Sequence, residues 1–241
     1  MTESPPSLRI QAYESFRRCV LAGRIRPGQF ISQRELMQML GVTLGAVREM
    51  IPRLEAARLI TTVPKRGLHL AHIDLRLIRN AFQVRSMIER EAIAHFMQSV
   101  SMSELDSVEL SHRQLLKRAE SDAPDARLDE DAQAIDWGLH DRMVDSMGNE
   151  ILSEVYRVNS LHVRMMALEM TQLRSLRVVP AMQEHLRFIA AMRERDTDAA
   201  VAAMLQHVSC SRQRVIDSAS GAPRVGPPGS QLHAATRRPL S

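Results

Sequence analysis

Cysteine, aromatic side chains and long apolar runs are all scarce in this sequence of 241 residues. The two cysteines, Cys19 and Cys210, form neither a paired zinc motif nor a disulfide framework, which is typical of proteins in a reducing compartment. Five Phe, two Tyr and one Trp disfavour a sheet-rich fold and a stacking surface for single-stranded nucleic acid. No run approaches about 18 apolar residues, and the N-terminus lacks a signal-peptide pattern. We therefore expect no membrane span and a cytoplasmic location.

The net charge of +4 is unevenly distributed along the chain. Residues 1–72 carry 11 basic and 5 acidic side chains, residues 73–210 carry 16 and 22, and residues 211–241 carry 5 and 1. A basic segment joined to an acidic one is typical of a polyanion-binding domain joined to a second domain, although uneven solvated surfaces would give the same pattern. Because seven of the 21 residues from Gly221 onward are Gly or Pro, we expect a disordered tail over 216–241.

Residues 8–73 show the order of elements of a winged helix-turn-helix domain. Apolar residues at helical spacing predict a first helix that ends at Gly23. Ser32 followed by Glu35 is a capping box, and Thr43 begins the helix that would read DNA. The expected elements are helices over 8–22, 32–40 and 43–57, and a β-hairpin over 59–70 with a basic tip at 64–67.

Residues 74–215 are predicted to form an all-α bundle of about six helices. The expected helices cover 75–100, 104–120, a segment ending near 148, 150–173, a segment from Pro180 to 195, and a last helix capped by Thr197 or Asp198. The predicted fold class is therefore mainly α, with an N-terminal winged helix-turn-helix joined to a C-terminal helical bundle.

Short polar and cationic side chains gather where the N-terminal domain would meet DNA. Cations and helix N-termini hold phosphates, and a helix in the major groove reaches base edges. The hairpin tip, with Arg66 followed by Gly67, could enter the minor groove. The alternative is an ordinary basic surface. The candidate DNA-binding residues are Ser32, Arg34, Thr43, Arg48, Lys65, Arg66 and Gly67.

The predicted bundle contains a possible metal site. Asp136 and His140 are four residues apart and share one helix face. His185 and His207 are 22 residues apart, and the break near Asp196 lies eleven residues from each. A helical hairpin at that break would bring both histidines to the same height, and one carboxylate with three imidazoles suits Zn²⁺, Mn²⁺, Ni²⁺ or Fe²⁺. The alternative is separate surface or core-edge histidines, as we expect for His95, His112 and His162.

These segments carry a resemblance to a known family. Residues 13–67 resemble the DNA-binding domain of GntR-type bacterial transcription regulators, through LAGRIRPG (21–28), SQREL (32–36), LGVT (40–43), VRE (47–49) and KRG (65–67). The predicted helical bundle resembles the FCD ligand-binding domain of the FadR-type branch, through VRSMIE (84–89), DWGLH (136–140), GN (148–149), EHL (184–186) and His207. The resemblance implies a homodimer that binds a pseudo-palindromic operator in double-stranded DNA and responds to a small metabolite, typically a carboxylate.

The resemblance also implies roles for individual residues. Arg34 and Arg48 match DNA-contacting arginines of the family, and residues 65–67 match its wing tip. The family's metal ligands fall on Asp136, His140, His185 and His207. Arg85 matches an arginine that faces the pocket, so we expect it to pair with the effector carboxylate. On this basis, replacing Arg85 with Ala should weaken effector binding and leave the fold intact.

The sequence departs from the family pattern in the predicted recognition helix. After the position of Thr43 the family usually has an arginine and a small polar residue, whereas this chain has Leu44 and Gly45. Pro52 lies inside the same helix, where it removes one backbone hydrogen bond. We therefore expect an operator that differs from the commonest one of the family.

Two other functions, a metal-dependent hydrolase and a DNA-architectural protein, are alternatives to a regulator. A metal-dependent hydrolase would use the Asp/His cluster with Glu184 or Glu89 as general base, but it leaves the basic N-terminal domain unexplained. A DNA-architectural protein without an effector leaves the metal ligand set unexplained. The sequence therefore predicts a transcription regulator that is not an enzyme, in which effector binding alters the spacing of the two recognition helices of a dimer.

Overall fold

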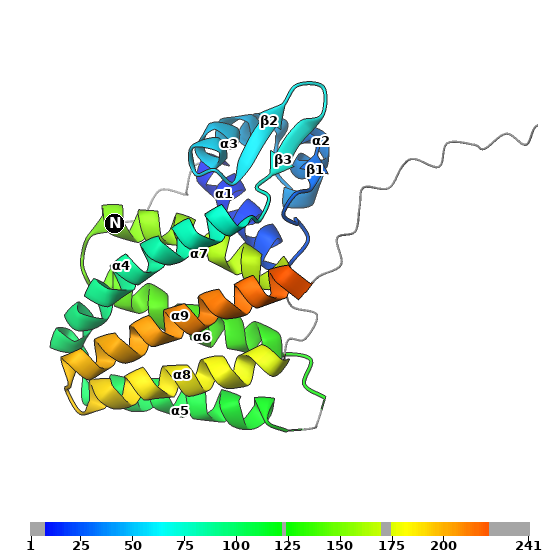
Figure 1. Cartoon of the computed structure of the whole chain (residues 1–241). Coiled ribbons are helices and arrows are strands. Elements are labelled where there is room, and N and C mark those ends of the chain that lie inside the picture. Colours follow the sequence, from blue (N-terminus) through cyan, green and yellow to red (C-terminus); the bar gives the residue numbers. More distant parts are fainter. Residues whose placement is uncertain (1–7, 122–123, 170–174, 222–241) are drawn as a thin grey trace, which may run out of the picture.

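A computed structural model describes residues 8–121, 124–169 and 175–221. Its architecture confirms the predicted fold class: a small winged helix-turn-helix domain rests on a larger bundle of helices (Figure 1). Most of the predicted disordered tail and the end of the helix expected over 150–173 lie outside the described residues.

The N-terminal domain packs three helices against a small antiparallel sheet. Its elements are α1 (Leu8–Leu21), β1 (Phe30–Ile31), α2 (Gln33–Leu40), α3 (Leu44–Ala56), β2 (Ile60–Val63) and β3 (Gly67–Leu70), with strand order β1-β3-β2. The capping box is present: the Ser32 hydroxyl accepts from the Glu35 amide at 3.2 Å, and the Glu35 carboxylate accepts from the Ser32 amide at 2.8 Å. The strand β1 was not predicted, because two residues are too few for an alternating pattern.

The basic hairpin tip depends on one glycine. The turn closes where the Arg66 amide donates to the Val63 carbonyl at 3.0 Å, with Lys65 at a φ of 63°. Gly67 has a φ of 95°, and a Cβ there would lie 2.8 Å from the Ile31 carbonyl oxygen. Glycine is therefore needed at the point where β1 passes close to the start of β3.

The recognition helix α3 starts and ends within the predicted limits. The Thr43 side chain accepts from the Ala46 amide at 3.2 Å and caps the helix. Pro52 lies inside α3, and the helix continues past it to Ala56. Its buried residues, Ala46, Val47, Met50, Ile51 and Leu54, pack into the core of the N-terminal domain.

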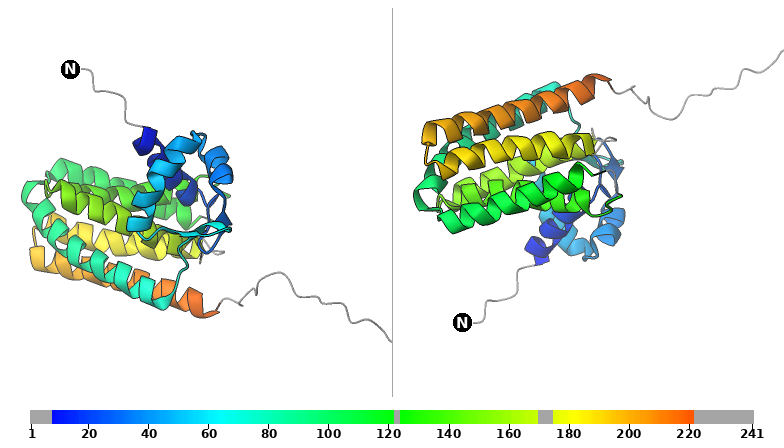
Figure 2. Two further views of the ribbon diagram at one scale, coloured as in Figure 1. Left: turned by 90° about the horizontal axis from the view of Figure 1, so that it is seen from above. Right: turned by 90° about the horizontal axis from the view of Figure 1, so that it is seen from below.

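The C-terminal domain contains α4 (Leu75–Ser99), α5 (Met102–Ala119), α6 (Leu128–Asp145), α7 (Glu150–Glu169), α8 (Ser175–Arg193) and α9 (Thr197–Gly221). The helix α4 packs along α9, α9 packs on α8, and α8 packs on α5 (Figure 2). The helix α6 contacts α4, α5, α7 and α8, so its residues reach the middle of the bundle. None of the described helices is long and apolar enough to cross a membrane.

Three predicted boundaries in this domain were wrong. The helix α8 begins at Ser175, which places Pro180 in its second turn rather than before it. The start of α9 is capped by Asp196, whose Oδ1 accepts from the Ala199 amide at 2.9 Å, and not by Thr197 or Asp198. The same helix extends to Gly221, so residues 216–221 are helical rather than part of a disordered tail.

The helix α7 joins the two domains. It lies between α1 and the rest of the bundle (Figure 1), and it contacts α1, α4 and α6. Leu161 and Met165 of α7 are buried in the core of the N-terminal domain. The N-terminal domain therefore rests on one helix of the C-terminal domain through shared apolar packing.

Candidate metal and effector site

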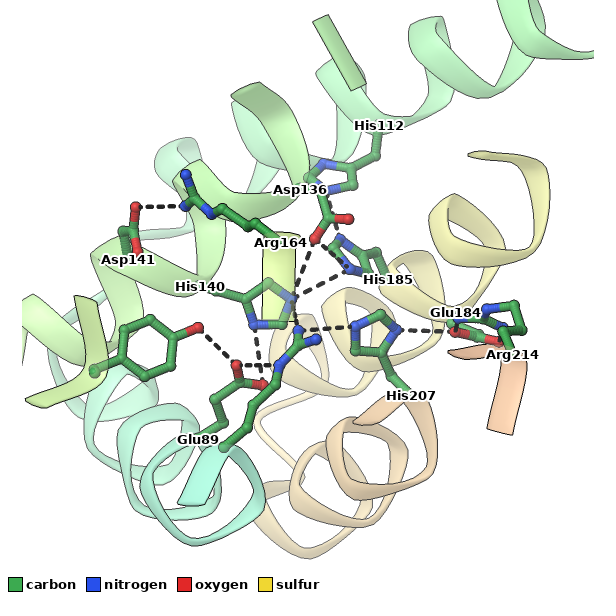
Figure 3. Close-up of polar contacts among 12 residues, drawn as sticks. Glu89, His112, Asp136, His140, Asp141, Arg164, Glu184, His185, His207 and Arg214 are labelled. Carbon is green, nitrogen blue, oxygen red and sulfur yellow. Dashed lines mark hydrogen bonds and ion pairs between the residues drawn. The ribbon is translucent and has the colours of Figure 1, made fainter. Parts of the chain in front are cut away.

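The structure brings the four predicted metal ligands together inside the bundle. Asp136 and His140 lie on α6, His185 on α8 and His207 on α9 (Figure 3). One ligand atom from each residue lies within 4.8 Å of the others, and the three histidines are at most 2% exposed. The helical hairpin around Asp196 produces this convergence, because it sets His185 and His207 on adjacent antiparallel helices.

The distances between the ligand atoms fit a single transition-metal ion. Nε2 of His185 lies 3.4 Å from Nε2 of His140 and 3.5 Å from Oδ1 of Asp136, and Nε2 of His140 is also 3.5 Å from that oxygen. Ligand bonds of about 2.1 Å place the ligand atoms of one ion about 3.0–3.4 Å apart. Oδ1 of Asp136 is buried and has no hydrogen-bond partner among the described residues. A cation would satisfy that oxygen.

Hydrogen bonds to the outer ring nitrogens set the tautomers of two ligands. Nδ1 of His112 lies 2.7 Å from the Val108 carbonyl, which can only accept, so this nitrogen carries a proton. In neutral His112, Nε2 therefore accepts from Nδ1 of His185 at 3.1 Å. Nδ1 of His207 donates to Oε2 of Glu184 at 2.9 Å. The Nε2 lone pairs of both ligands consequently face the shared centre, as metal-ligating histidines require.

The orientation of His140 and the pKa shifts of His185 and His207 are also consistent with a metal site. Nδ1 of His140 faces Oε2 of Glu89 at 3.2 Å, which leaves its Nε2 for the centre. Burial lowers the pKa of His185 well below its usual value, and the surrounding histidines add to the shift. Burial also lowers the pKa of His207, against the opposing effect of Glu184. Both rings are therefore uncharged at neutral pH. A set of three imidazoles with one carboxylate matches Zn²⁺, Mn²⁺, Ni²⁺ or Fe²⁺.

Arg85 points into the same centre from α4 and is only 2% exposed. Its Nε donates to Oε1 of Glu89 at 2.7 Å, and its Nη2 lies 3.1 Å from Nε2 of His140 and 3.3 Å from Nε2 of His207. Its guanidinium carbon is 4.8 Å from the centre of the Trp137 ring. In contrast to the expectation from sequence, we expect Arg85→Ala to destabilise the fold, because the substitution would leave Glu89 buried without its main counterion.

Both carboxylates that were considered as general bases are held by cations. Arg214 donates to the two oxygens of Glu184 at 2.6 and 2.9 Å. Burial raises the pKa of Glu184, but Arg214 and His207 outweigh it and lower the pKa to about 2. Burial likewise raises the pKa of Glu89, but Arg85, His140 and Tyr156 together outweigh it and hold the pKa well below its usual value. Such weak bases are poorly suited to general-base catalysis near neutral pH.

Three residues of this centre were missed or misplaced by sequence reasoning. His112 was expected at the surface or core edge but is 1% exposed and bonded to His185. Glu89 was considered only as a base, and Tyr156, whose hydroxyl donates to Glu89 at 2.7 Å, was not considered. Of the other two histidines, His95 is half-buried and His162 contacts the N-terminal domain.

The candidate DNA-binding side chains lie on the surface of the N-terminal domain. Ser32, Arg34, Thr43, Arg48, Lys65 and Arg66 are all exposed. The hairpin that carries Lys65 and Arg66 projects away from the bundle (Figure 1). The Arg66 guanidinium lies 4.0 Å from the centre of the Phe30 ring, which holds the cation at the side of the wing. Three helices with a wing, joined to a bundle with a buried polar centre, define a DNA-binding protein with a separate ligand-binding domain.

Comparison with known proteins identifies the family. Residues 8–70 match the family described as "Bacterial regulatory proteins, gntR family", and residues 80–209 match the "FCD domain". The chain belongs to the gntR family of bacterial regulatory proteins and carries an FCD domain. It is a DNA-binding transcription regulator, and the FCD domain indicates a small-molecule effector. The family match gives no support to the hydrolase alternative.

Individual relatives cover most of the chain. The Nta operon transcriptional regulator of Aminobacter aminovorans is 24% identical over 197 residues, which are 82% of this chain and 89% of that protein. The structure of McbR/YncC from E. coli has a TM-score of 0.73 at 16% identity and covers 89% of this chain and 100% of its own. The metal-free FCD domain of TM0439 has a TM-score of 0.54 at 18% identity and covers 63% of this chain and 100% of its own. These structures share the fold of this chain.

Proposed function

We propose that this regulator belongs to the FadR-type branch and that a small carboxylate, bound at a metal-containing pocket of the C-terminal domain, controls its affinity for an operator. One observation carries the proposal. Four potential ligand atoms, from Asp136, His140, His185 and His207, converge in a buried centre with the Arg85 guanidinium beside them. A buried dication next to an arginine is a favourable site for an organic acid.

Each group in the centre has a separate task. Asp136 and the three histidines hold a divalent transition metal, Zn²⁺ or else Mn²⁺, Ni²⁺ or Fe²⁺, which supplies an open coordination position for a carboxylate oxygen. Arg85 binds the acid through the planar fork of its guanidinium. The outer partners Glu89, Glu184 and His112 keep the ligand rings in the orientation that the structure shows.

The proposal includes a homodimer on double-stranded DNA in the bacterial cytoplasm, at the nucleoid. Two copies of α3 would enter successive major grooves of a pseudo-palindromic operator, whose half-sites must match the spacing of the helices. Phosphates and bases would be contacted by Ser32, Arg34, Thr43, Arg48 and by residues 65–67 of the wing. A small rigid-body shift between the domains changes that spacing and hence the operator affinity.

Native mass spectrometry of the purified full chain tests the sensing and assembly parts together. We expect a dimer that carries a transition metal in each protomer, and an organic acid that is lost on gentle activation. A metal-free monomer would contradict both parts of the proposal.

Arg48→Ala is expected to weaken DNA binding by about 5–150-fold, the range for losing one base contact. If Arg48 contacts a phosphate instead, the slope of log affinity against log salt should fall by about 1. The measurement is fluorescence anisotropy on a duplex that the wild-type chain selects from random sequence. Arg113→Ala is the control, since Arg113 is an exposed arginine on α5. Wild-type affinity and salt slope in Arg48→Ala would remove Arg48 from the interface.

Arg85→Lys is expected to weaken binding of the acid by about tenfold or more, because lysine keeps the charge opposite Glu89 but loses the bidentate fork. The probes are C2–C6 mono- and dicarboxylic acids, titrated against the fluorescence of Trp137, the single tryptophan of the chain. The same titration of Arg113→Ala serves as a control. Equal affinities of wild type and Arg85→Lys for an acid that the wild type binds would show that Arg85 does not hold its carboxylate.

A further inference from the structure

One helix, α7, contacts both the metal and effector site and the recognition helix. We propose that α7 transmits occupancy of the site to the C-terminal end of α3, and that Tyr156 is the residue through which the site acts on α7. The inference rests on the proposed function, because it assigns the route by which that site controls DNA binding.

On the site side, Tyr156 and Arg85 share one carboxylate oxygen. The Tyr156 hydroxyl donates to Oε1 of Glu89 at 2.7 Å, and Nε of Arg85 donates to the same oxygen at 2.7 Å. Tyr156 is 1% exposed and Glu89 is fully buried, so water does not replace a lost donor. A buried carboxylate without its partners is strongly unfavourable. A displacement of Arg85 must therefore be compensated by the other donors to Glu89, and Tyr156 is the one that belongs to α7.

Arg85 cannot keep its present contacts when a metal binds. Its Nη2 lies 3.1 Å from Nε2 of His140 and 3.3 Å from Nε2 of His207, and the lone pairs of these two nitrogens are the ones that would ligate a metal. One lone pair cannot accept from a guanidinium and ligate a cation at once, and two neighbouring cations repel each other. If His140 and His207 held a metal, the Arg85 guanidinium would therefore have to move away from them, with or without an effector.

A second set of contacts leads from Arg85 to the same helix. The guanidinium carbon of Arg85 lies 4.8 Å from the centre of the Trp137 ring, and that of Arg164, on α7, lies 4.5 Å from the same centre. Arg164 also pairs with Asp141 of α6 at 3.2 Å (Figure 3). A movement of Arg85 thus reaches α7 through Trp137 as well as through Glu89.

On the other side, α7 contacts the end of the recognition helix directly. Nε2 of His162 donates to the carbonyl of Ala57, the C-cap of α3, at 3.0 Å. The Glu154 carboxylate pairs with Arg53 in the last turn of α3. Since α7 is a continuous helix, a shift at Tyr156 moves Glu154 and His162 with it. The opposite end of α3, at Thr43, carries the candidate DNA contacts.

Hydrogen exchange with Zn²⁺ as the probe tests this route in the full chain. In wild type, Zn²⁺ should alter exchange of the backbone amides of residues 53–59 and 150–165 by about threefold or more. In Tyr156→Phe, the response at 53–59 should fall below about half of the wild-type change when both proteins are saturated with Zn²⁺, as judged from Trp137 fluorescence. The control is Arg113→Ala, which removes an exposed arginine of α5 that pairs with Glu109 of the same helix.

The outcomes separate this inference from the proposed function. If wild type does not bind Zn²⁺, the metal site fails, and the route fails with it. If wild type binds Zn²⁺ but residues 53–59 do not respond, or if Tyr156→Phe responds as wild type does, only the route is overturned. Glu154→Gln gives a second test that does not depend on a buried residue, since the Glu154 side chain is half exposed. This variant should bind Zn²⁺ as wild type does and lose the response at 53–59, and a full response would contradict the route.

Discussion

Glu89→Gln should lower the free energy of unfolding by about 3–5 kcal/mol, the usual consequence of breaking a buried ion pair on one side only. The substitution keeps the size of the side chain but removes the charge opposite Arg85, which is 2% exposed and donates to Glu89 at 2.7 Å. Tyr156 and His140 also lose a charged partner. The effect is measured from urea unfolding of EDTA-treated protein at neutral pH, followed by circular dichroism.

A matched substitution isolates the role of burial. Glu14 also pairs with an arginine of its own helix, Arg17, but these two side chains are 43% and 32% exposed. Glu14→Gln should therefore cost less than about 1 kcal/mol, as expected for a surface pair. Equal stabilities of the Glu89→Gln and Glu14→Gln proteins would show that the buried pair contributes little to the fold.

The convergence of Asp136, His140, His185 and His207 was partly accessible from sequence, because helical spacing allows it and the resemblance to the FCD domain points to these four residues. The spacing of Asp136 and His140 places both on one face of α6, and the equal distances of His185 and His207 from Asp196 place them level across a hairpin. These relations depend only on the rise of a helix and on the position of its break. They hold even though the cap of α9 was assigned to the wrong residue.

The surrounding residues were not accessible, because no local pattern links them to the ligands. His112 reaches His185 from α5, and Glu89 reaches His140 from α4, through the packing of helices that are distant in sequence. Glu89 resembles any glutamate four residues after an arginine, which is normally a solvated helical pair. Burial converts that common pair into the counterion of the site, and burial follows from tertiary packing.

In the fold, too, elements with local sequence signals were predicted, and elements that depend on tertiary packing were not. Capping residues and glycines predicted α2, α3 and the hairpin, because their signals are local. The strand β1 exists because β3 offers it hydrogen-bond partners: residues Phe30 and Ile31 pair with His69 and Leu68. Pro180 predicts that the helix follows it, yet α8 begins five residues earlier, at Ser175. The helix as a whole packs on α5 and α9, and one lost backbone hydrogen bond does not interrupt it.

His185→Gln is expected to weaken Zn²⁺ binding by at least about 100-fold, because removing a ligand exceeds the 10–100-fold loss typical of an outer-shell partner. His185 is the ligand closest to the middle of the set: its ring centre lies 5.1 Å from that of His140 and 4.6 Å from that of His207. Zn²⁺ affinity is measured by competition with a chromophoric chelator on the full chain.

A graded series distinguishes a metal centre from histidines that merely pack together. His112→Gln should weaken Zn²⁺ binding by about 10–100-fold, since His112 orients His185 without ligating. His95→Gln, on α4 and outside the cluster, should bind Zn²⁺ as wild type does. Packing alone predicts instead that the two buried sites, His112 and His185, lose similar amounts of stability and that neither changes a specific Zn²⁺ affinity. If the site binds a metal, the loss of Zn²⁺ affinity is therefore largest for the ligand variant His185→Gln, intermediate for His112→Gln and absent for His95→Gln.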